Sequence, residues 1–360
     1  MKVAIDIQST IVKPTGIGYY TKNLIDEYKN HDEVDFYYYK PAQQQEFNTL
    51  ERMHWENIVL RSYASRDKVD ILHITGFAGP YINTKFKKIT TVHDLIGMLY
   101  PQNLALVSRF YWQKCLPACV RTSDFIISDS ENTKKDLVSM LNFPSNKIEV
   151  VHLAAAKEFC YIKDKSHCCK RLKELTGLEN PFILSVSTIE PRKNFSVLLK
   201  AYSLCSEEIK KEFKIVIVGK KGWGFPQVEK DVKGLGLEKN IIFLNYVDTE
   251  TLVLLYNCAS VFVFPSFYEG FGLPVLEAFS CGVPVIASDT SSIPEVAQGA
   301  ALLFAPNDIE LLRDHMSEII KSDDIQKDLS ARGIDRAKDF NWEKTAEKTL
   351  DIYKRVYERY

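Results

Sequence analysis

Short runs rich in Val, Ile, Phe and Tyr recur along this chain, and the segments between them carry apolar residues at helical spacing. This alternation is typical of βα units, in which a helix connects each strand to the next parallel strand. The first set of expected strands lies at 3–7, 35–39, 69–74, 88–92, 125–129 and 148–152. The second set lies at 182–187, 214–219, 241–247, 260–264, 284–288 and 301–304. Two such sets predict an α/β fold with two doubly wound, Rossmann-like domains instead of one large sheet.

The chain is 360 residues long, which at roughly 150 residues per domain also favours two domains. A lysine-rich stretch from Cys160 to Asn180 separates the two sets of strands. We therefore expect an N-terminal domain over 1–165 and a second domain over 166–340. Apolar residues at helical spacing predict two helices between Ile325 and Tyr360. The last helix, at about 341–360, is expected to pack back on the first domain.

Composition and charge exclude several classes of protein. Lys and Arg number 46 against 47 Asp and Glu, so the net charge is −1 and no basic excess favours bulk binding of nucleic acid. No apolar run reaches the about 18 residues of a membrane helix, and strand-like residues stand where a secretory signal would begin. A cytoplasmic protein is therefore expected. Aromatic and cationic residues at 109–114 motivate a separate hypothesis, a peripheral contact with the inner face of a membrane.

The chain has eight cysteines, which in a protein of this size without a secretory signal are expected to be reduced core residues. The tightest group is Cys160 with His167, Cys168 and Cys169. It lacks a second pair at the spacing of a zinc site, so no metal site is expected.

A glycine-bearing segment follows the first expected strand. Gly16 and Gly18 allow backbone N–H groups to approach a phosphate at the start of a helix. A dinucleotide-binding fingerprint needs a third glycine, where this chain has Thr21, and an acidic residue after the second strand, where it has Lys40. Binding of NAD is therefore not expected. A turn that simply needs positive φ is the alternative explanation for the two glycines.

His93 and Asp94 come directly after the expected strand 88–92. Ligands of open α/β sheets bind at the carboxyl ends of the strands. His93 is therefore a candidate for orienting or stabilising a substrate without transferring a proton.

Arg192 and Lys193 follow the first strand of the second domain, immediately after the rigid Pro191. Two adjacent cations at a strand end suit an anionic leaving group such as a diphosphate. Asn194 is expected to cap a helix at 195–202. The alternative for the cations is a pair of solvated surface charges.

The stretch 264–282 carries two carboxylates around one expected helix. Pro274 fits the first turn of that helix and Gly282 its end, which leaves Glu269 in the preceding loop and places Glu277 within the helix. Carboxylates accept paired hydrogen bonds from vicinal diols, so one can hold a ribose and the other a sugar. Backbone N–H groups of residues 271–273 would face a phosphate between them.

Together and in this order, the segments resemble the family 4 retaining glycosyltransferases of the GT-B fold. Within that family, they resemble mannosyltransferase-like enzymes that build bacterial polysaccharides and lipopolysaccharide O-chains. The resemblance covers nearly the whole chain. It rests on TGIGYYTKNL, TTVHDL, SDSENTKKDL, STIEPRKN, IVGKKGWG and FPSFYEGFGLPVLEAFSCGVPVIASD, continued through Ser292–Val296.

The resemblance implies two domains that face each other across a cleft holding the site. It implies transfer of a hexose, with mannose favoured, from a nucleotide-diphosphate sugar to a glycan or lipid-linked saccharide, with retention at the reacting carbon. GDP-mannose is favoured over a UDP-sugar as the co-substrate. No bound metal or other cofactor is implied, and the chain has no Asp-x-Asp motif.

The resemblance also implies roles for single residues. Arg192 and Lys193 would bind the diphosphate and stabilise its departure, His93 would contact the donor sugar near the reacting carbon, and Glu269 would hold sugar hydroxyls. Glu277 would hold the ribose, and the loop around Val247 would meet the base through its backbone. The substrate-binding positions are Gly16, Gly18, Asp94, Ser187, Val247, Phe271, Gly272, Leu273 and Glu277.

Two positions depart from the family pattern. Ser187 stands where the family often has Gly, and Ala154–Ala156 replace a turn that usually contains Gly. Ser187 would either crowd the diphosphate or donate a hydrogen bond to it. Two other functions stay open: an inactive protein that only binds a nucleotide sugar, and a sugar-nucleotide epimerase of the same fold.

Overall fold

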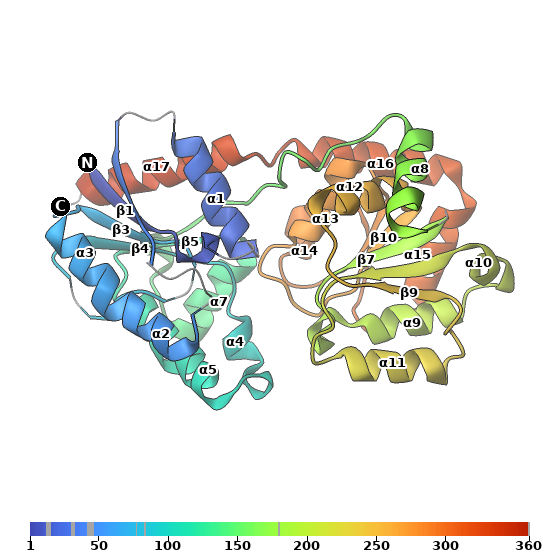
Figure 1. Cartoon of the computed structure of the whole chain (residues 1–360), viewed down its shortest axis with the longest axis horizontal. Helices are drawn as coiled ribbons and strands as arrows, with labels where there is room; N and C mark the ends of the chain where they lie inside the picture. The colour runs from blue at the N-terminus through green and yellow to red at the C-terminus, as the bar shows by residue number, and fades with distance from the viewer. Residues whose placement is uncertain are drawn as a thin grey trace. The chain divides into compact units, whose positions relative to one another are not determined.

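The computed structural model describes residues 1–11, 16–29, 33–41, 47–76, 78–82, 84–178 and 181–358. The chain divides into two compact units, each considered below by itself (Figure 1). Unit 1 comprises Met1–Leu153 and Asn341–Tyr360, and unit 2 comprises Ala154–Phe340.

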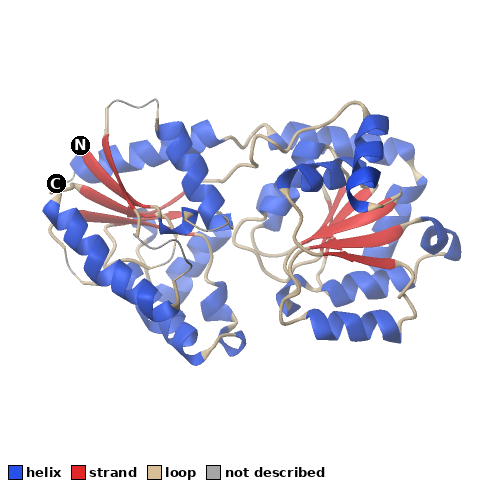
Figure 2. Cartoon of the chain, viewed as in Figure 1, coloured by secondary structure: helices blue, strands red, loops and turns tan. Residues whose placement is uncertain are grey.

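The described part of unit 1 forms a six-stranded parallel sheet in the order β2-β1-β3-β4-β5-β6, with helices on its faces (Figure 2). Most of the buried strands are largely apolar, as parallel strands covered on both faces require, although one of them also buries Lys88, Thr90 and Thr91. The strands are β1 (Lys2–Asp6), β2 (Asp35–Tyr39), β3 (Ile71–Ile74), β4 (Lys87–Val92), β5 (Phe125–Ser128) and β6 (Ile148–Val150).

Helices and short 3-10 and π-helical turns connect these strands, and the last helix of the unit ends the chain. The α-helices are α1 (Gly16–Tyr28), α2 (Thr49–His54), α3 (Leu60–Arg66), α4 (Ile96–Leu99), α5 (Leu106–Phe110), α6 (Leu116–Arg121), α7 (Glu131–Leu141) and α17 (Trp342–Glu358). The 3-10 turns are η1 (Gln8–Thr10), η3 (Pro101–Asn103) and η5 (Ser145–Lys147), and the π-helical turns are η2 (Trp55–Val59) and η4 (Tyr111–Cys115).

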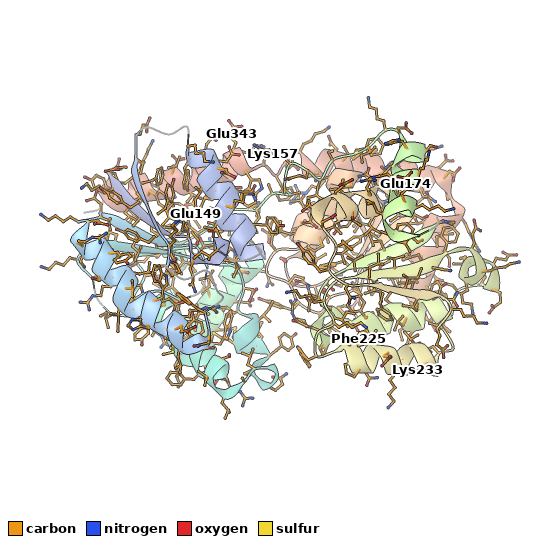
Figure 3. The ribbon with its side chains drawn as sticks, viewed as in Figure 1. Glu149, Lys157, Glu174, Phe225, Lys233 and Glu343 are labelled. Atoms are coloured by element: carbon orange, nitrogen blue, oxygen red, sulfur yellow. The ribbon has the colours of Figure 1, made fainter. Side chains whose placement is uncertain are left out.

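Helix α17 ends the chain but packs within unit 1. The hydroxyl of Tyr353 lies 2.6 Å from Nδ1 of the buried His73 on β3. Thr345 donates to the carbonyl of His152 at 2.7 Å, and Arg355 pairs with Glu149 on β6. Glu149 is labelled in Figure 3. The final helix therefore completes the core of the N-terminal sheet.

The described part of unit 2 forms a second six-stranded parallel sheet in the order β12-β11-β10-β7-β8-β9. Its strands are β7 (Phe182–Val186), β8 (Lys214–Val218), β9 (Ile241–Leu244), β10 (Val261–Phe264), β11 (Val285–Ser288) and β12 (Leu302–Phe304). Its helices are α8 (Lys165–Thr176), the 3-10 turn η6 (Pro191–Lys193), α9 (Phe195–Ser203), α10 (Glu207–Glu212), α11 (Phe225–Gly234), α12 (Thr249–Cys258), α13 (Leu273–Cys281), α14 (Ile293–Ala297), α15 (Ile309–Lys321) and α16 (Asp323–Ala337).

The predicted fold class is confirmed, because both sheets are parallel and doubly wound. Each of the predicted strands overlaps an observed one, and only the ends differ by a few residues. The two helices expected between Ile325 and Tyr360 are α16 and α17. The strand order of each sheet reverses at one point, between β1 and β3 in unit 1 and between β7 and β10 in unit 2. Ligands of such sheets bind at the carboxyl ends of the strands beside that point.

One local prediction is wrong, and one alternative explanation is excluded. Asn194 precedes α9, but with φ at +53° its side chain makes no capping bond and donates instead to the carbonyl of Pro306 at 2.7 Å. A capping residue normally has extended backbone, and the left-handed conformation turns the side chain away. Gly16 and Gly18 lie in the first turn of α1, where φ is negative, so a need for positive φ does not explain them.

No helix in the described ranges is long and apolar enough to cross a membrane.

Candidate functional site

Strands β7 and β10 are neighbours at the reversal point of unit 2, and the loops after them carry three charged side chains that meet. Lys193 donates from Nζ to Oε1 of Glu269 at 2.5 Å. Arg192 donates from Nη1 to Oε2 of the same carboxylate at 3.2 Å. The backbone joins the loops too, since Phe267 N donates to the Arg192 carbonyl at 2.8 Å. One carboxylate thus accepts from both predicted cations.

The charges of this cluster are held in a buried setting. Burial, together with the neighbouring Arg192 charge, lowers the pKa of Lys193 below its ordinary value. Burial alone would raise the pKa of Glu269, but the charges of Lys193 and Arg192 outweigh it and hold that pKa below its ordinary value. Glu269 is therefore ionised at neutral pH. Arg192 also pairs with Glu190 at 3.0 Å, so the two cations are not freely solvated surface charges.

Three glycines of the segment after β8 support the loop that carries Arg192 and Lys193. A Cβ added at Gly219, which has φ of +143°, would lie 2.1 Å from the carbonyl oxygen of Ser187. At Gly222 it would lie 2.7 Å from the carbonyl oxygen of Ile189, and at Gly224 2.9 Å from the backbone of Glu190. The IVGKKGWG segment therefore lets one loop lie directly against the backbone of the other. Sequence reasoning used these glycines only as part of the family pattern.

Helix α13 begins at Leu273, has Pro274 in its first turn and ends at Gly282 with φ of +73°, as the sequence predicted. Glu277 lies within it and accepts a hydrogen bond from the hydroxyl of Tyr256 at 3.0 Å. Burial raises the pKa of Glu277 to about 7. The N-terminal N–H groups of any helix lack intrahelical acceptors. Contacts of Phe271, Gly272 and Leu273 with a phosphate stay a prediction.

Two serines after β11 hold the loop that carries Glu269. The Glu269 N–H donates to Oγ of Ser291, a residue with φ of +53°, at 2.9 Å. The fully buried Ser292 lies within hydrogen-bond distance of the carbonyls of Glu269 and Phe271, at 3.0 and 2.7 Å. Ser291 and Ser292 were not among the predicted site residues. Their position after the carboxyl end of β11, the strand beside β10, is the feature that could have identified them.

Val247 lies between β9 and α12, and Asp248 caps α12 by accepting from Thr251 N at 2.8 Å. The adjacent Tyr246 is 55% exposed. Contact between this loop and a base stays a prediction.

In unit 1, His93 follows β4 and both of its ring nitrogens face acceptors. Nδ1 lies 2.6 Å from Oδ2 of Asp129, and Nε2 lies 2.8 Å from the carbonyl oxygen of Thr75. Burial by itself lowers the pKa of His93, but Asp129 and the Thr75 carbonyl outweigh it and raise that pKa above its ordinary value. The arrangement therefore suits a doubly protonated imidazolium. Sequence reasoning did not single out Asp129, although it comes directly after β5, the strand next to β4.

Asp94, Gly16 and Gly18 are the other predicted positions in unit 1. Asp94 accepts from Ile96 N at 2.9 Å and so fixes the turn after His93. Gly18 is buried at the start of α1, whereas a Cβ added at Gly16 would meet no atom within 4 Å. Thr15, which precedes them in the family pattern, lies outside the described residues.

The structure also describes the two positions that depart from the family pattern, Ser187 and Ala154–Ala156. Ser187 N donates to the Val218 carbonyl at 2.9 Å, and its own carbonyl is the atom against which Gly219 lies. Ala154–Ala156 have no positive φ, so their backbone does not need glycine.

No disulfide bond joins the cysteines that the structure describes, and six of the eight are buried as predicted, whereas Cys160 is exposed and Cys169 is partly exposed. Within the same residues, no group of three His, Cys, Asp or Glu side chains fits a metal ion.

Two family models match the chain, one for each unit. "Glycosyltransferase Family 4" matches residues 14–155, and "Glycosyl transferases group 1" matches residues 170–336.

Solved structures show the same fold. Sucrose-phosphate synthase from Thermosynechococcus elongatus superposes with a TM-score of 0.80 at 19% identity and covers 100% of both chains. The Anabaena protein Alr3699/HepE, in complex with UDP and glucose, superposes with a TM-score of 0.74 at 16% identity and covers 98% of this chain and 99% of its own.

Proteins related in sequence narrow the comparison from the fold to the family. The chain is 32% identical to O-antigen chain mannosyltransferase B of Escherichia coli over 295 residues, which cover 82% of this chain and 77% of that protein. It is 29% identical to the serotype-specific mannosyltransferase WbdA of Escherichia coli over 77% of this chain. The matched region covers 34% of that longer protein. With both units matched and this identity over most of its length, the chain belongs to the family 4 glycosyltransferases.

Proposed function

We propose that the protein is a retaining, metal-independent hexosyltransferase that moves mannose from GDP-mannose to a saccharide or lipid-linked glycan. The observation that carries this proposal is the joint contact of Arg192 and Lys193 with Glu269 at the ends of β7 and β10. Two cations beside a reversal point suit the diphosphate of a nucleotide sugar.

Arg192 and Lys193 would stabilise the negative charge that grows on the diphosphate as the bond to the sugar breaks. Glu269, which accepts from both cations in the free protein, would turn to the sugar hydroxyls when the diphosphate takes its place. Preorganised donors of this kind typically contribute about 10²–10³ in turnover each. Because the two side chains supply positive charge, transfer is expected to proceed at the same rate in excess chelator.

Retention follows if the acceptor hydroxyl attacks from the face that the diphosphate leaves. The leaving phosphate oxygen would accept the hydroxyl proton, so no protein base is needed. His93, as an imidazolium, would donate a hydrogen bond near the reacting carbon, which requires it to release the carbonyl of Thr75. NMR of the first product tests retention, because an α-configured donor must give an α-configured product.

The mannose assignment is supported by the mannosyltransferase at 32% identity. The UDP complex of the structural neighbour makes a UDP-sugar the alternative donor. Thermal unfolding with GDP or UDP separates them, since a ligand at 100 times its dissociation constant stabilises by about 2.7 kcal/mol. Stabilisation by UDP alone would contradict the assignment. Incubation with GDP-mannose alone then separates transfer from epimerisation, because an epimerase converts the donor without an acceptor.

A cytoplasmic location with contact to the inner membrane face is part of the proposal. Of the aromatics in the segment 109–114, Tyr111 is buried and donates to Glu56 at 2.6 Å, whereas Phe110 is exposed. Helix α5 therefore carries exposed apolar side chains, since Leu106 and Phe110 are 79% and 54% exposed. They would reach the membrane that holds a lipid-linked acceptor.

A further inference from the structure

Three cysteines of unit 2 meet where helix α8 packs against helix α12 (Figure 1). The Sγ atoms of Cys169 and Cys258 lie 3.1 Å apart, and those of Cys258 and Cys168 lie 3.3 Å apart. A disulfide bond has a length of about 2.0 Å. A movement of about one ångström would therefore bring the nearer pair to bonding distance.

The three thiols differ in access. Cys168 and Cys258 are buried, whereas Cys169 is partly exposed at the surface of α8. Burial raises the pKa of both Cys168 and Cys258, which keeps them protonated and poorly reactive toward reagents in solution. A soluble oxidant therefore meets Cys169 first, and Cys258 is the thiol next to it.

We propose that Cys169 and Cys258 form a reversible disulfide when the protein meets a small-molecule disulfide such as oxidised glutathione. Cys169 is the thiol that reacts first, and Cys258 is the thiol that resolves it. The site belongs to unit 2, lies apart from the cluster around Glu269, and does not depend on the proposed reaction.

The exchange occurs in two steps. The Cys169 thiolate attacks one sulfur of oxidised glutathione, which forms a mixed disulfide and releases one glutathione thiolate. Cys258 then gives its proton to the released thiolate, and its sulfur attacks Sγ of Cys169 and displaces the second glutathione. Two cysteine thiols are oxidised and one glutathione disulfide is reduced to two thiols, so atoms and electrons balance.

Lys165 favours the second step. Its ammonium group donates to the carbonyl and Oδ1 of Asn257, the residue before Cys258, at 2.9 and 3.0 Å. The charge of Lys165 is close enough to interact with Cys168, Cys169 and Cys258. A positive charge at this place stabilises the thiolate of Cys258 as it forms.

The bond would join two segments that already share a hydrogen-bonded junction. Asn257 accepts from Ile162 N at 2.8 Å and donates to the Cys160 carbonyl at 3.0 Å, which fixes the segment leading into α8 against the end of α12. The disulfide would add a covalent link to this junction. It is expected to raise the unfolding temperature of the oxidised protein.

The test treats the native protein with oxidised glutathione, blocks free thiols with iodoacetamide, and maps cross-linked peptides by mass spectrometry. We expect a cross-link between Cys169 and Cys258 that dithiothreitol removes. C258S should stop at a glutathione adduct on Cys169, and C168S should keep the cross-link. C160S, which removes an exposed cysteine outside the triplet, is the matched control and should behave as wild type.

Several outcomes would overturn the proposal. One is a glutathione adduct on Cys169 that persists in the wild-type protein. Another is a cross-link of Cys258 to Cys168 instead of Cys169. A third is a cross-link that forms only in urea, since it would belong to the unfolded chain. Circular dichroism of each serine variant checks that the comparison is made between folded proteins.

Discussion

Lys193 and Glu269 form a buried ion pair with 2.5 Å between Nζ and Oε1, although 76 positions separate them in the chain. Loss of Glu269 would leave Lys193 buried without this carboxylate, at a cost of about 3–5 kcal/mol, whereas loss of Lys193 leaves Glu269 with Arg192. The pair therefore contributes both to the fold of unit 2 and to the proposed reaction, and experiments have to separate the two contributions.

We expect K193M to lower mannosyl transfer by about 10²–10³ because it removes one donor to the diphosphate. It should also lower stability, since Glu269 loses one of its two cationic partners and keeps only Arg192. The double variant K193M/E269Q removes the stranded charge and should recover stability without recovering transfer. Transfer from GDP-mannose to mannose-containing oligosaccharides and urea unfolding are the measurements. Recovery of activity together with stability would mean that Lys193 has only a structural role.

Glu277 is expected to make nucleotide binding dependent on pH. Its pKa is about 7 in the free protein, and a ribose diol donates hydrogen bonds to the ionised form. Binding therefore lowers this pKa, and the affinity for GDP should rise between about pH 6 and 8. Calorimetric titration of the wild type with GDP measures the affinity at each pH. The same titration of E277Q, in the same buffers, corrects for protonation of the nucleotide itself. Equal pH profiles for the two proteins would remove Glu277 from the ribose site.

Asp129 is expected to keep the imidazole of His93 charged. In D129N only the Thr75 carbonyl and the Asp94 charge still oppose the effect of burial, so the pKa of His93 should fall relative to the wild type. In the wild type, the raised pKa of His93 contributes to the free energy of unfolding. This contribution is fully present at pH values below the unfolded-state pKa, and it is lost as the pH rises through the folded-state pKa. NMR titration of the His93 ring, assigned with H93Q, measures the shift. An unchanged pKa in D129N would show that the carboxylate does not control it.

Gly222 is expected to be essential for the loop that carries the cations. G222A would place its Cβ 2.7 Å from the carbonyl oxygen of Ile189 and push the loop away. We expect a loss of stability of about 1–3 kcal/mol and weaker binding of GDP. G234A is the matched control, because its Cβ meets no atom within 4 Å and alanine suits a helix. Similar behaviour of the two variants would contradict the packing argument.

Helix α5 is expected to carry the membrane contact. F110D should reduce sedimentation with anionic liposomes at low salt, because it places a negative charge in the exposed apolar surface. The control variant is L204D, which changes a leucine of unit 2 that is 53% exposed, about as much as Phe110. It should sediment as the wild type does. The hypothesis fails if the wild-type protein stays in the supernatant, or if both variants are affected alike.

Local sequence patterns were sufficient to predict much of the fold and the ends of the helix that carries Glu277. Apolar periodicity located the strands, and Pro274 and Gly282 located α13, because dihedral preferences act within a few residues. Asn194 was assigned wrongly by the same reasoning, because the conformation of its backbone depends on the loop around it.

The sequence by itself determined two doubly wound sheets, the family, and the residues at the carboxyl ends of the strands. Only the tertiary structure decided which of those residues meet: Glu269 with both Arg192 and Lys193, and Asp129 with His93. Helical and strand periodicity are properties of neighbouring residues. Strand order is set by the packing of whole βα units and is not contained in any local pattern. It is the placement of β7 beside β10, and of β4 beside β5, that brings these distant side chains together.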